Sequence, residues 1–181
     1  MHAASDARGR VFGLRGVTRK RARQVYEFPL DAGELADVLA SMARLAAAGD
    51  GWINLVPQLA GEDENPTSLR FSTLFGGGNS GITMCTWIPG RHEQHGGKPS
   101  TLGIAHVTGR RAVAQLAASG VVVPKAWFVE QDHLRRGLVV RLPPDELNEE
   151  VLSWSLRALR ALSAPRQVRG WRADVYLPTQ S

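Results

Sequence analysis

Hydrophobic residues recur at helical spacing in three segments of the chain. The first segment follows Asp31 and Glu34, which have the spacing of a capping box, and stops at Gly49. Its apolar residues fall on one face of a helix and are Leu35, Val38, Leu39, Met42 and Leu45. This pattern predicts an amphipathic helix that packs against a core.

The second and third helical segments are residues 109–119 and 145–163. The second is short, contains Val113 and Leu116, and is ended by Gly120. The third has acidic residues in its first turns and Arg157 and Arg160 in its later turns, an arrangement that the helix dipole favours. Its apolar seam consists of Leu147, Val151, Trp154, Ala158 and Leu162.

Short apolar or alternating runs between turn residues predict β-strands. The runs are residues 24–29, 52–59, 69–75, 82–88, 101–107, 126–130, 138–142 and 171–177. The last run alternates apolar residues with Arg172, Asp174 and Tyr176, which predicts a strand buried on one face only.

The order of these elements predicts the fold class. Most successive strands are joined by short links without a crossover helix, which favours antiparallel neighbours over a doubly wound parallel sheet. We therefore expect an α+β fold with a single, predominantly antiparallel sheet of about seven or eight strands and three helices packed on one face. Two β-α-β-β units beginning near Val25 and Thr101 suggest a pseudo-repeat.

Charge is distributed very unevenly along the 181 residues. The first 25 residues contain one acidic side chain, Asp6, and seven basic ones, whereas the remainder contains 15 basic and 16 acidic side chains. The seven are Arg8, Arg10, Arg15, Arg19, Lys20, Arg21 and Arg23. We therefore expect a flexible basic extension over residues 1–24 and one near-neutral domain over residues 25–181.

The basic extension is the first candidate binding site. Arg19, Lys20, Arg21 and Arg23 could contact phosphates of a nucleic acid or carboxylates of an acidic protein surface. The alternative is a structural subunit whose solvated tail is inert.

Two further patterns are typical of anion binding. Arg110 and Arg111 lie at a predicted helix start, where free N–H groups attract anions. The glycine-rich residues 76–81 lack the Lys-Ser/Thr pair of a phosphate loop, so we interpret them as a hairpin connection.

Histidines provide the only metal candidates, and we expect neither a metal nor a cofactor. His92 and His95 are three positions apart in a Gly- and Pro-rich loop, and His106 could supply a third ligand. The spacing differs from that of the HExxH zinc helix, which favours exposed loop histidines. Cys85 is the only cysteine, which excludes an internal disulfide, and it lies within a predicted strand, where we expect it in the core.

No apolar stretch has the length of a signal peptide or a membrane span, so we expect a cytoplasmic protein without a membrane span. No serine-nucleophile motif is present. We therefore expect a non-enzymatic binding protein whose cationic arm engages an anionic partner. The alternative is a small enzyme or ligand-binding domain with a cleft between its halves, into which His92, His95, His106 or Glu130 would point.

Overall fold

The computed structural model describes residues 23–29, 35–59, 83–91, 97–106, 108–163 and 168–178. Within these ranges the chain forms seven strands and three helices. In chain order they are β1 (Arg23–Pro29), α1 (Ala36–Ala48), β2 (Trp52–Leu59), β3 (Met84–Ile88), β4 (Thr101–Ala105), α3 (Ala112–Ala118), β5 (Phe128–His133), β6 (Gly137–Arg141), α4 (Asn148–Ser163) and β7 (Val168–Tyr176).

All seven strands belong to one antiparallel sheet with the order β1-β7-β2-β3-β4-β6-β5. The expected fold class, an α+β fold with one antiparallel sheet and three helices, is therefore confirmed for the described residues. Strand β3 pairs with β4 along five residues, so the two β-α-β-β units are joined edge to edge in one sheet. In both units one strand lies between the two strands that flank the helix: β7, from outside the unit, between β1 and β2, and β6, from within the unit, between β4 and β5.

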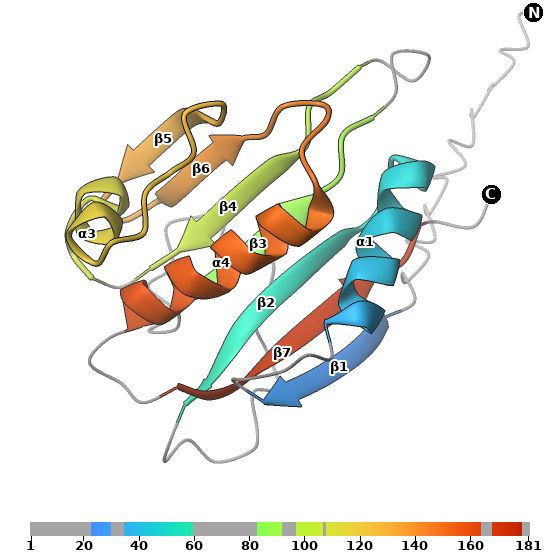
Figure 1. Ribbon diagram of the computed structural model, residues 1–181, viewed down its shortest axis with the longest axis horizontal. Helices are drawn as coiled ribbons and strands as arrows, with labels where there is room; N and C mark the ends of the chain where they lie inside the picture. Colours follow the sequence, from blue (N-terminus) through green and yellow to red (C-terminus); the bar gives the residue numbers. More distant parts are fainter. Residues whose placement is uncertain are drawn as a thin grey trace, which may run out of the picture.

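The three helices lie on the same face of this sheet, with α4 across its middle, α1 towards β7 and β1, and α3 at the β5–β6 end (Figure 1). The core fills the space between the helices and the sheet. One row of it runs across four neighbouring strands through Leu55, Cys85, Ile104 and Leu138, which are in register and buried. Burial of this continuous apolar face is the main favourable term in folding.

Helix α1 follows the predicted stripe. Val38, Met42 and Leu45 are buried, and Leu35 and Leu39 pack against the core at its margin. Gly49 caps the helix with a φ of 60°, a left-handed conformation that glycine adopts without steric cost. The capping residues that the sequence suggested, Asp31 and Glu34, lie outside the described residues, as do the predicted strand 69–75 and the glycine-rich loop 76–81.

Several boundaries differ from the sequence prediction. Strand β5 continues to His133, so the hairpin turn contains only Leu134 to Arg136. Gly137 follows with a φ of 82°, and a Cβ atom there would lie 2.2 Å from the carbonyl oxygen of Ile104. Glycine is therefore required where β6 begins beside β4.

The helices also begin later than their patterns suggest. Arg111 has an extended backbone, so α3 starts at Ala112. Leu147 precedes α4 and is exposed, whereas the remaining members of its predicted seam, Val151, Trp154, Ala158 and Leu162, are buried.

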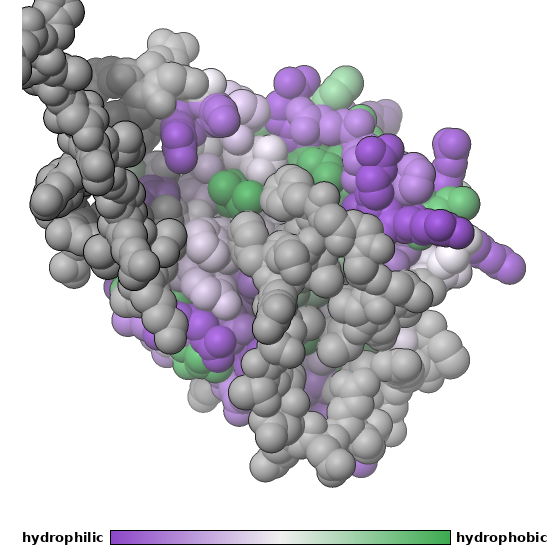
Figure 2. Space-filling model, turned by 180° about the vertical axis from the view of Figure 1, so that it is seen from behind, coloured by the Kyte–Doolittle hydropathy of each residue, from purple (hydrophilic) through white to green (hydrophobic). Residues whose placement is uncertain are grey.

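Strand β7 differs most from its sequence pattern. Asp174 was expected on a solvated face, but it is buried: β7 lies between β1 and β2, and the guanidinium groups of Arg23 and Arg172 lie beside the carboxylate. Asn54 on β2 and Thr86 on β3 are also buried on this second face, which points away from the helices. Figure 2 views the molecule from that side, where hydrophilic and hydrophobic side chains of the described residues are intermixed.

Candidate functional site

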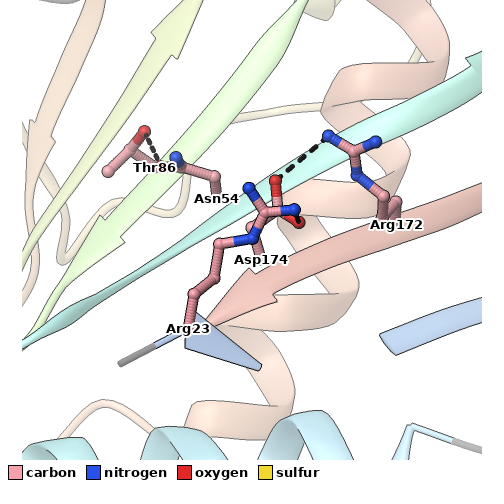
Figure 3. Close-up of polar contacts among 5 residues, drawn as sticks. All are labelled: Arg23, Asn54, Thr86, Arg172 and Asp174. Atoms are coloured by element: carbon pink, nitrogen blue, oxygen red, sulfur yellow. Dashed lines mark hydrogen bonds and ion pairs between the residues drawn. The ribbon is translucent and has the colours of Figure 1, made fainter. Parts of the chain in front are cut away.

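Five polar side chains gather on the second face of the sheet, and we call them the Asp174 cluster. They come from four neighbouring strands: β1 at one edge of the described sheet, followed by β7, β2 and β3 (Figure 3). The members are Arg23 on β1, Asn54 on β2, Thr86 on β3, and Arg172 and Asp174 on β7.

Asp174 is the centre of this cluster and its side chain is only 4% exposed. Nη2 of Arg172 donates to Oδ2 of Asp174 at 3.1 Å, and Nη2 of Arg23 lies 3.6 Å from Oδ1. Figure 3 shows both guanidinium groups turned towards the carboxylate. A buried carboxylate is tolerated when cations and hydrogen bonds replace the water that it has lost.

The strand register explains why these residues meet. Arg172 and Asp174 are two positions apart on one strand, so both point to the same face. Asn54 is directly opposite Asp174 on one side and opposite Thr86 on the other. Oγ1 of Thr86 donates to Oδ1 of Asn54 at 2.7 Å, which extends the polar row across β3.

An aromatic pair borders the cluster on the same face. The rings of Trp52 and Tyr176 are stacked, with centroids 4.6 Å apart and planes 16° from parallel. These two residues are opposite each other on β2 and β7, and Tyr176 is also opposite Arg23. The stacked rings of Trp52 and Tyr176 therefore lie beside Arg23, the first residue of β1.

The cluster ties the beginning of β1 to the middle of the sheet. Arg23, whose side chain is 48% exposed, was predicted as the last basic residue of the N-terminal extension. In the structure it belongs to β1 and pairs with a buried carboxylate of the domain. The other predicted anion-binding residues of the extension, Arg19, Lys20 and Arg21, lie outside the described residues.

Arg110 and Arg111 precede α3 and are exposed. The helix N-terminus beside them is already occupied by a carboxylate from β5. The N–H groups of Ala112 and Val113 donate to Oδ1 and Oδ2 of Asp132 at 2.7 and 3.3 Å. The positive charges of Arg110 and Arg111 oppose the helix dipole at this N-terminus, and the carboxylate of Asp132 compensates for them.

His106 follows β4 and is buried close to this helix start. Its Nδ1 lies 2.9 Å from Oγ1 of Thr108. Burial lowers the pKa of His106 because it disfavours the charged imidazolium, and the negative charge of Asp132 opposes this shift.

His92 and His95 lie outside the described residues, so their relation to His106 is untested. Within the described part of the chain, no three His, Cys, Asp or Glu side chains gather as a metal site would require.

Cys85 is fully buried in the core, as its strand position predicted. Burial raises the pKa of its thiol to about 12, and a hydrogen bond with Ser155 on α4 lowers it only in part. Because the thiolate is the nucleophilic form, this cysteine is inert at neutral pH.

A hollow of about 470 Å³ lies where α4 begins. Its lining includes Trp127, Trp154, Glu149, Glu150 and Arg157. The indole nitrogens are already occupied: that of Trp127 donates to Glu146 at 2.7 Å and that of Trp154 donates to the carbonyl of Val122 at 2.9 Å. Hydrogen bonding and charge repulsion from Glu146 raise the pKa of Glu150. The lining of the hollow therefore contains two tryptophans and more acidic than basic side chains.

The sequence analysis missed the Asp174 cluster, although one signal for it was present. Asp174 is the only acidic residue among residues 151–181, which contain five arginines. An acid at position i+2 from an arginine in a predicted strand lies on the same face as that arginine. A single acid with this spacing in a basic segment therefore indicates an internal ion pair.

No protein-family model, curated protein or solved structure matches the chain. None of the described helices combines the length and hydropathy needed to cross a lipid bilayer.

Proposed function

We propose that this protein is a non-enzymatic binding protein that presents residues 1–22 as a cationic arm to an anionic partner. The observation that carries the proposal is the separation of charge along the chain. Residues 1–22 contain six basic side chains and one acidic side chain, whereas residues 23–181 contain sixteen of each. The net charge of +5 therefore belongs entirely to the segment that precedes β1.

The Asp174 cluster supports this division. Arg23 is the one basic residue of the predicted extension that is described in the structure, and it lies 3.6 Å from the carboxylate of Asp174, which also pairs with Arg172. The ion pair also fixes the point at which the arm leaves the sheet, beside the stacked rings of Trp52 and Tyr176. Fixing one end of a segment limits how far that segment can reach.

Nucleic acid is the partner that this chemistry fits best. Five of the six basic residues of the arm are arginines, whose planar guanidinium groups bind phosphates through paired hydrogen bonds. Each neutralised phosphate releases counterions, so affinity that comes from the arm must fall steeply with salt concentration.

The alternatives stay predictions. For the alternative of a cleft between two halves, the pairing of β3 with β4 places both halves in one sheet. Glu130, which was suggested for that cleft, forms an ion pair with Arg141 on the neighbouring strand at 3.7 Å. The buried thiol of Cys85 weighs against cysteine chemistry. The experiment below distinguishes the proposed function from a structural subunit with an inert tail.

The test compares the full chain with a full-length variant in which Arg8, Arg10, Arg15, Arg19, Lys20 and Arg21 are replaced by glutamine. Binding to a fluorescent 30-base-pair DNA is measured by anisotropy over a series of salt concentrations. For the unmodified protein we expect a plot of log K against log salt with a slope of about −5, since each phosphate contact contributes about −0.9. The variant should lose this slope and most of its affinity.

The matched control replaces Arg110 and Arg111 by glutamine, because these exposed arginines belong to the domain and not to the arm. Equal DNA binding by the six-glutamine variant contradicts the proposal. Equal competition by polyglutamate and DNA would instead assign the arm to an acidic protein surface. If the unmodified protein binds neither probe, the arm is inert.

A further inference from the structure

Strand β5 is the last strand at one end of the described sheet, and β6 is its only strand partner there. An edge strand presents backbone N–H and C=O groups that can pair with another strand. Natural edges are often protected by lysine, proline, charged residues or a bulge. β5 has a bulge between Val129 and Gln131 and the charged residues Glu130 and Asp132, but it contains neither lysine nor proline.

Exposed apolar side chains are concentrated at this edge. Of the six large hydrophobic residues exposed in the described part of the chain, Phe128 and Val129 lie on β5 and Leu134 lies in the turn that follows it. Phe128 is 57% exposed, and the guanidinium of Arg141 lies 4.6 Å from the centre of its ring. Figure 2 shows hydrophobic surface beside strongly hydrophilic surface at the β5–β6 end, on the right of the view.

The opposite edge of the described sheet differs from β5. Strand β1 carries the charged residues Arg23 and Glu27 and ends at Pro29, which cannot donate a backbone hydrogen bond. Arg23, Val25 and Glu27 are two positions apart, so all three lie on the same face of the sheet at this edge. Strand β5 also carries charged residues, Glu130 and Asp132, so among the described side chains the two edges differ in the exposed large hydrophobic residues, two on β5 and Val25 alone on β1, and in the proline of β1.

The charges along β5 select the direction in which a second strand fits. The beginning of the strand is apolar and acidic, with Phe128, Val129 and Glu130. The turn that follows the strand is basic, with Arg135 and Arg136, whose backbone N–H groups donate to Nδ1 of His133. The carboxylate of Asp132 also lies near this end, but it accepts the N–H groups of Ala112 and Val113, and the dipole of α3 offsets part of its charge.

We propose that a second copy of this chain pairs with β5 in an antiparallel, two-fold symmetric arrangement. Antiparallel pairing places the beginning of each β5 beside the end of the other, so Glu130 approaches Arg135 of the second copy. Phe128 and Val129 then lie near Leu134 of the second copy. A two-fold interface of this kind uses one self-complementary surface twice. The sheet of one copy continues into the sheet of the other.

The test is a reversal of charge followed by its compensation. The full chain is examined by sedimentation velocity over a concentration series, and we expect a dimer. Glu130→Arg places like charges together in the dimer and should raise the dimer dissociation constant at least about tenfold, which corresponds to about 1.4 kcal/mol. Adding Arg135→Glu and Arg136→Glu to the same chain should restore dimerisation.

Glu149→Arg is the matched control, because Glu149 is an exposed acid on α4 and the change in net charge is the same. It should leave the dissociation constant unchanged. Circular dichroism confirms that each variant is folded, and loss of the exposed ion pair between Glu130 and Arg141 costs at most about 1 kcal/mol.

Phe128→Lys provides a second, apolar test of the same edge, with Leu147→Lys as its control since Leu147 is similarly exposed away from β5. Phe128→Lys should weaken the dimer, whereas Leu147→Lys should not. A monomeric unmodified chain at about 100 µM, a concentration that populates even micromolar dimers, overturns the proposal. A dimer that survives both Glu130→Arg and Phe128→Lys overturns it as well.

Discussion

At the scale of single residues, Asp174 is the one acidic side chain that is buried in the described part of the chain. Its carboxylate is almost fully buried between a guanidinium that is 13% exposed and one that is half exposed. The Coulomb attraction of such a group is strong only because water is excluded, and the same exclusion makes loss of one partner costly.

Replacement of Asp174 by alanine should lower the free energy of unfolding by about 3 kcal/mol, because Arg172 is then buried without a counter-charge. Urea denaturation provides the measurement. The double variant Asp174→Ala, Arg172→Leu should recover at least half of the loss, since it removes the uncompensated charge.

The control for this prediction is Glu27→Ala on β1, an exposed acid for which we expect a change below about 0.5 kcal/mol. A loss at Asp174 no larger than at Glu27 would mean that the cluster contributes nothing to stability. A double variant as unstable as the single one would mean that packing, and not charge, is the cause.

At the scale of elements, α3 depends on β5. The helix has only seven residues, a length at which isolated helices are unstable. It has no side-chain cap from its own N-cap residue, Arg111, and receives its cap from Asp132, twenty positions later in the chain. Hydrophobic periodicity predicted α3 from the sequence. The cap could not be predicted from a local pattern, because Asp132 lies on β5, far from α3 along the chain.

Asp132→Ala should destabilise α3, because the N–H groups of Ala112 and Val113 lose their acceptors. Loss of a helix cap costs about 1 to 2 kcal/mol. Native-state hydrogen exchange should therefore become faster by roughly a factor of 5 to 30 for the amides of α3.

Asp132→Asn keeps one side-chain oxygen as an acceptor and should have a smaller effect. The amides of α1, which lies at the other end of the sheet, provide the internal reference (Figure 1). Equal acceleration in α1 and α3 would show global destabilisation and contradict a local cap.

At the scale of the whole molecule, charge and fold are separate properties. The domain from residue 23 onward has equal numbers of basic and acidic side chains, so the basic character of the protein comes from residues 1–22. Net charge governs solubility and association with polyions, and it does not determine the fold.

Replacing the six basic residues of the arm by glutamine should therefore move the isoelectric point from strongly alkaline to near neutral without loss of the sheet. Isoelectric focusing and circular dichroism measure the two properties on the same sample. The variant should also become least soluble near neutral pH, where its net charge approaches zero. Loss of the circular dichroism signal would mean that the arm is needed for folding.

The sequence by itself determined the fold class, the three helices and all seven described strand positions with small shifts of their ends, because these depend on apolar spacing and on glycine and proline. The first residue of β1, Arg23, was assigned to the arm alone. These are local properties, and each is visible in a window of a few residues.

Only the tertiary structure decided the strand order and the residues that it brings together. The last strand lies between the first and second, which buries Asp174 and places it beside Arg23 across 151 positions of sequence. The same assembly leaves β5 at an edge and turns Asp132 towards α3. Such contacts depend on which strands become neighbours, and neighbours in a sheet are selected by the packing of the entire chain and not by any one segment.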